Sequence, residues 1–131
     1  MKKGLKITLI VLAVVVLIVA VLIIVFTSMA KGLEAYLEEV DIREVDLGTI
    51  SDGTYHSRVN AGVIIVELEV DVKNHTIRDI RLLEHRNGQG GEAENIIPRI
   101  IEEQRINVDV ISGASYSSLV IQDAVMKALS P

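Results

Sequence analysis

The hydrophobic positions of the chain form one continuous run near the N-terminus and several short periodic patterns after it. Residues 9–26 contain no polar side chain and no glycine. At about 1.5 Å per residue, such a run forms a helix of about 27 Å, close to the thickness of a bilayer's hydrocarbon core. The pattern therefore predicts a transmembrane helix within residues 1–30.

The charges beside this run predict its orientation. Lys2, Lys3 and Lys6 precede it, whereas only Lys31 follows it closely. The positive-inside rule then places the N-terminus in the cytoplasm and the rest of the chain outside, as a single-pass protein of the cell membrane. Ser28-Met29-Ala30 also fits a signal-peptide cleavage site. A cleaved signal is the alternative, although its apolar centre is usually about 7–15 residues long.

Helical spacing resumes just after the run. Leu33, Tyr36, Leu37 and Val40 recur as on one face of a helix, which predicts an amphipathic helix or stalk within residues 31–47. The remaining residues, 48–131, are enough for one small domain.

The sequence pattern within residues 48–131 predicts three strands and two helices. Residues 64–72 alternate cleanly, with apolar side chains on one face and Glu67, Glu69 and Asp71 on the other. Shorter strands are expected at residues 55–60 and 77–84, and helices at residues 94–104 and 116–129. This order indicates an α+β fold, in which one face of a small antiparallel sheet packs against helices and the other face is exposed to solvent.

The composition and the sequence motifs argue against several classes of function. The chain has no cysteine, which excludes disulfides, thiol chemistry and cysteine-ligated iron–sulfur centres. Residues 7–131 carry 10 basic against 18 acidic groups, a net charge of −8, which is a poor composition for binding nucleic acid. The three histidines are scattered and predict no resident metal. No nucleophile elbow or Ser-His-Asp order supports a hydrolase.

The most informative segment is Asp109-Val110-Ile111-Ser112-Gly113-Ala114-Ser115-Tyr116-Ser117-Ser118. It places four hydroxyl side chains and a glycine at the start of a predicted helix. A helix start offers unpaired backbone N–H groups and a positive dipole end, which suit a phosphate. Gly113 would let a ligand approach the backbone closely. An ordinary serine N-cap is the alternative interpretation.

A second segment, His85-Arg86-Asn87-Gly88-Gln89-Gly90-Gly91, interrupts the strand pattern with closely spaced glycines. One interpretation is a wall against a flat ligand, and the other is a mobile connector.

These segments occur in an order that resembles a known family. Asp52-Gly53-Thr54-Tyr55, the alternating strand, the His85 glycine loop, Glu102-Glu103-Gln104 and the serine segment follow one another along residues 48–130. This order resembles the FMN-binding domain of the flavin-carrying subunits of sodium-pumping NADH:quinone reductase and of the Rnf complex. It also resembles short membrane-anchored, extracytoplasmic versions of that domain.

The resemblance implies a covalent cofactor. In the family, the pattern Asp-x-x-Ser/Thr-Gly-Ala-Thr/Ser carries FMN as a phosphoester on its final hydroxyl. Here the pattern covers residues 109–115, and that hydroxyl falls on Ser115. A flavin transferase installs the group from FAD with Mg²⁺ and releases AMP. The family most often has threonine at this position, and serine offers the same nucleophile. Ser112 is the next candidate acceptor.

The resemblance also implies roles for neighbouring residues. Gly113 and Ala114 would form the turn, and the phosphate would rest on amides near Tyr116, Ser117 and Ser118. Asp109 would position the acceptor hydroxyl or Mg²⁺, unless it is only a solvent-facing loop residue. The isoalloxazine ring would lie against His85, Gly88 and Gly90.

The sequence therefore predicts a membrane-anchored, extracytoplasmic electron-transfer flavoprotein, a carrier more than a self-contained enzyme. Its partners would be the transferase and a membrane redox protein or quinone-linked donor. Two alternatives stay open at this stage. One is a module that binds FMN non-covalently, as a flavin reductase or sensor, and the other is a non-enzymatic, membrane-anchored interaction domain.

Overall fold

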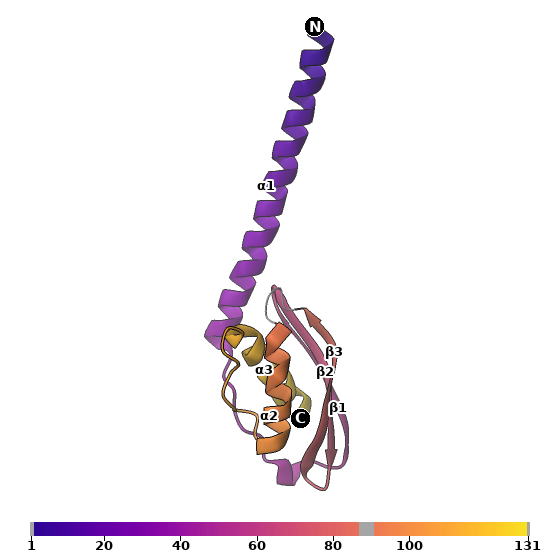
Figure 1. The fold of residues 1–131 in the computed structure, drawn as a ribbon, viewed down its shortest axis with the longest axis vertical. Helices are drawn as coiled ribbons and strands as arrows, with labels where there is room; N and C mark the ends of the chain where they lie inside the picture. Colours follow the sequence, from indigo (N-terminus) through magenta and orange to yellow (C-terminus); the bar gives the residue numbers. More distant parts are fainter. Residues whose placement is uncertain (1, 87–90, 131) are drawn as a thin grey trace.

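The chain forms one long helix followed by a small domain, as the computed structural model shows for residues 2–86 and 91–130 (Figure 1). The elements are α1 (Lys2–Glu39), the 3₁₀ helix η1 (Leu47–Thr49), β1 (Gly53–Ala61), β2 (Ile64–Lys73), β3 (Thr76–Arg86), the 3₁₀ helix η2 (Gly91–Asn95), α2 (Ile96–Glu103) and α3 (Ser115–Leu129). This arrangement confirms the predicted α+β class.

The three strands form an antiparallel sheet in the order β1-β2-β3. Val66, Leu68 and Val70 of β2 are fully buried, whereas Glu67 and Glu69 between them are partly exposed. Helices α2 and α3 lie over the apolar face, and the opposite face is left open (Figure 1). The period of two therefore predicted the buried face correctly, because alternate side chains of a strand point to opposite faces.

Helix α1 extends well beyond the domain. It has 38 residues, none of them buried, and its apolar part is long enough to cross a membrane. The helix continues past the apolar run to Glu39 without interruption, so the predicted anchor and amphipathic helix are one element. Residues 40–46 then run without helix or strand to η1.

The C-terminal turns of α1 are held against the domain. Gly32 meets the turn between β1 and β2, where a Cβ added to Gly32 would lie 3.5 Å from Cα of Gly62. Leu33 and Tyr36 are half-buried against the core. The backbones approach this closely because both residues at the contact are glycines. Helix α1 therefore leaves the domain in a defined direction.

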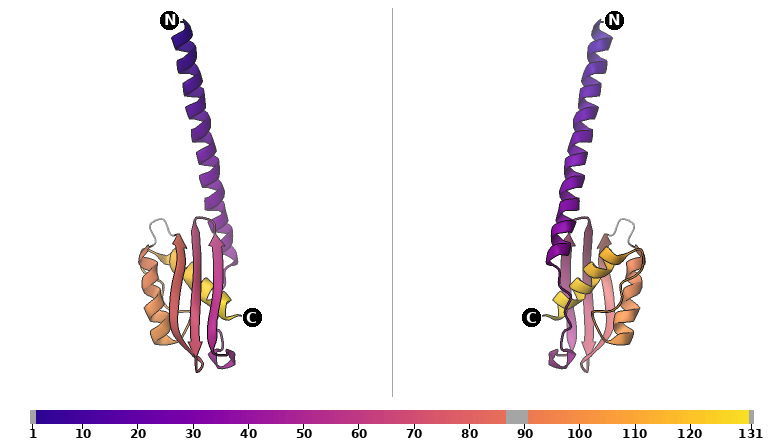
Figure 2. Two further views of the ribbon diagram at one scale, coloured as in Figure 1. Left: turned by 90° about the vertical axis from the view of Figure 1, so that its right-hand side faces the viewer. Right: turned by 90° about the vertical axis from the view of Figure 1, so that its left-hand side faces the viewer.

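The two ends of the domain differ in what they carry. The β1–β2 turn, the end of β3 and the start of α3 lie at the end from which α1 leaves, called here the α1 end (Figure 2). The Asp52-Gly53-Thr54-Tyr55 turn lies at the opposite end, where Oδ1 of Asp52 accepts a 2.7 Å hydrogen bond from the N–H of Asn74. That motif therefore closes a turn far from the serine segment.

Candidate functional site

The serine segment begins as a loop and continues into the first turn of α3. Ser115 is the first residue of this helix, and its side chain is exposed. Ala114 occupies the N-cap position, and no side chain in the part of the chain that the structure describes caps this helix end. The interpretation of the serines as an ordinary N-cap is therefore wrong. The loop of residues 109–115 is called the acceptor loop below.

The backbone at the start of α3 leaves amides open. The first helical hydrogen bond runs from the N–H of Ser118 to the carbonyl of Ala114, at 3.0 Å. The N–H groups of Ser115, Tyr116 and Ser117 come before it and have no carbonyl partner within the helix. They form the positive end of the helix dipole, which favours an anion. The Ser118 amide, which the sequence had included among the phosphate contacts, is already bonded.

Gly113 shapes the acceptor loop and leaves space over it. Its φ of +79° lies in the left-handed region, which favours glycine. Apart from the two adjacent residues, no atom of the described part of the chain would lie within 4 Å of a Cβ at this position. Glycine is therefore required here by backbone conformation, and the space beside it is open to a ligand.

The four serines of the segment have different environments. Ser112 and Ser115 are exposed, whereas Ser117 and Ser118 are buried. The hydroxyl of Ser118 donates to the carbonyl of Ala114 at 2.7 Å and accepts from the N–H of Ile111 at 3.1 Å. Ser118 is therefore a structural hydroxyl that closes the acceptor loop.

The segment that leads into the loop is held from two sides. The amide of Gln122, in α3, donates to the carbonyls of Ile106 and Val108 at 2.9 and 2.8 Å. The carboxylate of Glu44 accepts from the N–H groups of Ile106 and Asn107 at 3.0 and 2.8 Å. Sequence reasoning missed both residues. The only available signal was a glutamine among apolar helix positions, where a buried amide must find partners.

Asp109 lies at the start of the acceptor loop with an exposed side chain. Its backbone carbonyl accepts a 3.3 Å hydrogen bond from Nη1 of Arg99, in α2. This contact fixes the backbone of Asp109 and leaves its carboxylate facing solvent, where it can meet a cation or a transferase.

His85 lies near the end of β3, also at the α1 end of the domain (Figure 2). Its side chain is 3% exposed, and its Nδ1 lies 2.9 Å from Oε1 of Glu94. Glu94 belongs to η2, which packs on α3. The structure thus places His85 and the start of α3 on the same side of the domain, while Gly88 and Gly90 lie outside the described residues.

Among the described residues, two prominent hollows adjoin α1. One, of about 680 Å³, lies between α1, the β1–β2 turn and the start of α3, and Leu33, Leu37, Val63 and Tyr116 are among its walls. It is called the junction groove below. Sequence reasoning missed it, because its walls come from three separate segments.

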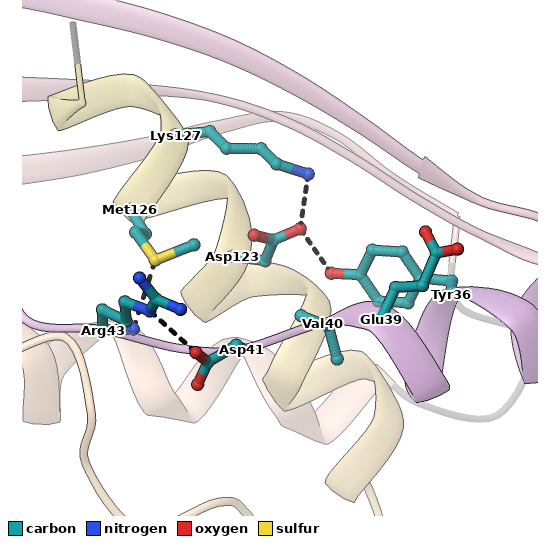
Figure 3. A pocket seen from close by; sticks show the side chains of 8 residues that line it. All are labelled: Tyr36, Glu39, Val40, Asp41, Arg43, Asp123, Met126 and Lys127. Atoms are coloured by element: carbon teal, nitrogen blue, oxygen red, sulfur yellow. Dashed lines mark hydrogen bonds and ion pairs between the residues drawn. The ribbon is translucent and has the colours of Figure 1, made fainter.

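The other hollow, of about 380 Å³, surrounds Tyr36 and Asp123 (Figure 3). Burial raises the pKa of Tyr36, and its hydrogen bond to Asp123 raises it further. Tyr36 therefore remains a neutral hydrogen-bond donor at physiological pH.

Together these features define a small α+β module in which an exposed hydroxyl lies at the uncapped start of a helix, a position that favours an anion. The model of the FMN-binding domain family matches residues 61–130, more than half of the 131-residue chain. The chain belongs to this family, and FMN is its cofactor. No curated protein and no solved structure matches the chain.

The described residues fit the phosphate end of FMN. The matched region contains the whole acceptor loop and α3. Three open amides, a helix dipole and the space beside Gly113 suit a phosphate dianion. When bound, FMN supplies one- and two-electron chemistry, and the chain supplies binding and orientation.

Proposed function

We propose that this chain is a membrane-anchored, extracytoplasmic electron-transfer flavoprotein that carries FMN as a phosphoester on Ser115. The observation that carries the proposal is the position of that hydroxyl. It is exposed on the first residue of α3, beside three open amides and an unfilled space at Gly113. A phosphate attached there lies against the positive end of the helix dipole.

Burial favours Ser115 over its neighbours as the acceptor. Ser117 is 3% exposed, and Ser118 is fully buried and already bonded. Ser112 is exposed but precedes Gly113, so it does not belong to the helix start. Ser115 alone among the four combines exposure with a place at the open amides.

The attachment step transfers the FMN part of FAD. The hydroxyl oxygen of Ser115 attacks the phosphorus of the FMN half and forms a new P–O bond. The bond from that phosphorus to the bridging oxygen breaks, and AMP leaves with the bridging oxygen. The proton of Ser115 passes to solvent or to the transferase, which also supplies Mg²⁺. Asp109, exposed at the other end of the acceptor loop, is our proposed contact for that Mg²⁺.

The membrane anchor and the covalent attachment would both keep the flavin beside its redox partners. α1 can cross a membrane, and three lysines precede its apolar run. With the N-terminus in the cytoplasm, the domain lies outside, where an unattached cofactor would diffuse away. A covalent flavin on an anchored domain stays at high effective concentration beside a membrane redox partner or a quinone-linked donor. Such a carrier needs no substrate pocket of its own.

Intact mass of the full chain tests the proposal. The chain is produced with an active flavin transferase and FAD, in membranes, and compared with Ser115→Ala, Ser115→Thr and the control Ser112→Ala. We expect the mass of one FMN phosphoester in the original chain, in Ser115→Thr and in Ser112→Ala, and no addition in Ser115→Ala.

Acid precipitation separates the alternatives. A covalent flavin stays with the precipitated protein, whereas flavin released into the supernatant would mean a non-covalent FMN module. If the transferase modifies a known substrate and this chain shows neither added mass nor flavin absorbance, the proposal is wrong.

A further inference from the structure

We infer that the junction groove holds the isoalloxazine ring, so that helix α1, the proposed membrane anchor, forms one wall of the flavin site. This position differs from the one that the family resemblance implies, against His85, Gly88 and Gly90. This inference rests on the proposed attachment at Ser115. It assigns a role to α1 beyond anchoring, because the residues just after the apolar run would then set the properties of the flavin.

The groove begins beside the attachment residue. Tyr116, the residue after Ser115, lines it and is 58% exposed. A phosphate on Ser115 therefore starts at one edge of the groove, and the flexible ribityl chain leads the ring away from the helix start. An exposed tyrosine ring offers the isoalloxazine a flat face for stacking.

The other walls suit a flat, largely apolar ring. The apolar side chains that line the groove come from α1 and from the β1–β2 turn, and they include Phe26, Leu33, Leu37 and Val63. Ligand sites are typically concave and mostly apolar, with a few polar groups that fix orientation. The volume of about 680 Å³ is in the range of such sites.

This α1 wall has a fixed position. A Cβ on Gly62 would lie only 2.5 Å from the carbonyl oxygen of Met29 and 3.0 Å from the nitrogen of Leu33. Tyr36, one turn further along α1, is bonded to Asp123 at 2.6 Å. The groove is therefore bounded by two parts of the protein that are packed together, rather than by a loosely tethered helix.

Two oppositely charged side chains of α1, Lys31 and Glu34, also line the groove. Two-electron reduction of FMN with uptake of one proton gives an anionic flavin. A nearby positive charge favours this anion and a nearby negative charge disfavours it. With the ring in the groove, Lys31 raises the reduction potential and Glu34 lowers it.

The test measures the midpoint potential of the flavinylated full chain in nanodiscs. The variants are Lys31→Met and Glu34→Gln. Their matched controls are Lys73→Met, at the far end of β2, and Glu102→Gln, on the exposed side of α2. We expect a more negative potential in Lys31→Met, a more positive one in Glu34→Gln, and the original value in both controls. Tyr116→Leu should also raise flavin fluorescence, because stacking on tyrosine quenches it.

Two results would overturn the inference. If FMN is attached but the four charge variants share one potential, the ring lies elsewhere and the proposed function still stands. If the potentials are unchanged and Lys31→Met instead weakens binding of a water-soluble quinone analogue, the groove is a quinone site. Absence of attached FMN in the original chain would refute the proposed function first, and intact mass shows this before any potential is measured.

Discussion

The hydroxyl of Tyr36 donates a 2.6 Å hydrogen bond to Oδ2 of Asp123 and thereby joins α1 to α3 (Figure 3). Nζ of Lys127 approaches the same oxygen at 2.8 Å. Asp123 is only 2% exposed, and a buried carboxylate is costly unless it is paired and hydrogen-bonded. Helix α1 therefore supplies a hydrogen-bond partner to a buried carboxylate of the domain.

Removal of the Tyr36 hydroxyl should destabilise the domain. In Tyr36→Phe, Asp123 keeps Lys127 but loses its second partner, so we expect the free energy of unfolding to fall by about 1–3 kcal/mol. Urea denaturation of the full chain in detergent measures the change. Tyr116→Phe is the control, because the Tyr116 side chain is largely exposed and its change should stay within about 0.5 kcal/mol. Equal losses in the two variants would contradict this role for the Tyr36–Asp123 bond.

Tyr36 also leads us to expect that the stability of the domain decreases at alkaline pH. Burial, and then the hydrogen bond to Asp123, raise the pKa of Tyr36 above its ordinary value of 10.0. Above that pH the unfolded chain releases the phenol proton and the folded chain retains it. The unfolded state is therefore favoured, and the free energy of unfolding falls. The stabilisation is fully present below pH 10 and declines as the pH rises further. Denaturation from pH 8 to 11 should show a steeper decline in the original chain than in Tyr36→Phe, and parallel curves would exclude this effect.

The contact between Gly62 and α1 predicts a substitution effect with two causes. In Gly62→Ala, the left-handed φ of +82° is strained, and the new Cβ would lie 2.5 Å from the carbonyl oxygen of Met29. Gly113→Ala is a matched control, since its φ is +79° but its Cβ would meet nothing within 4 Å. We expect a larger loss of unfolding free energy in Gly62→Ala, together with faster tryptic cleavage after Lys31 as α1 is displaced. Similar losses and unchanged cleavage in the two variants would show that α1 does not pack on this turn.

The regular elements were predictable because their signals are local. The alternation in residues 64–72 gave the buried face of β2, and the helix predicted at residues 116–129 begins one residue earlier, at Ser115. The exposed hydroxyl of Ser115 at the start of α3 was also predictable, since glycine and serine before a helical pattern indicate an open helix start.

The contacts that hold the acceptor loop and the walls of the junction groove were not predictable, because they bring together residues that are distant in sequence. Glu44 binds the backbone of Ile106 and Asn107 across more than 60 positions. The junction groove likewise exists only because α1 packs beside Val63 and Tyr116. The spacing of apolar and polar residues does not reveal such contacts, and it did not reveal that the Ser118 hydroxyl is buried and closes the acceptor loop.

The acceptor loop predicts a difference between two adjacent buried serines. The Ser118 hydroxyl bridges the N–H of Ile111 and the carbonyl of Ala114, so Ser118→Ala leaves a buried N–H without its partner. Such a loss costs about 1–3 kcal/mol and loosens the loop that presents Ser115. Ser117→Ala removes the same atom from an equally buried position that does not close the loop. We expect slower flavin attachment in Ser118→Ala, followed by intact mass over time at a temperature at which both variants are folded. Equal rates in the two variants would show that the transferase, rather than Ser118, orders the acceptor loop.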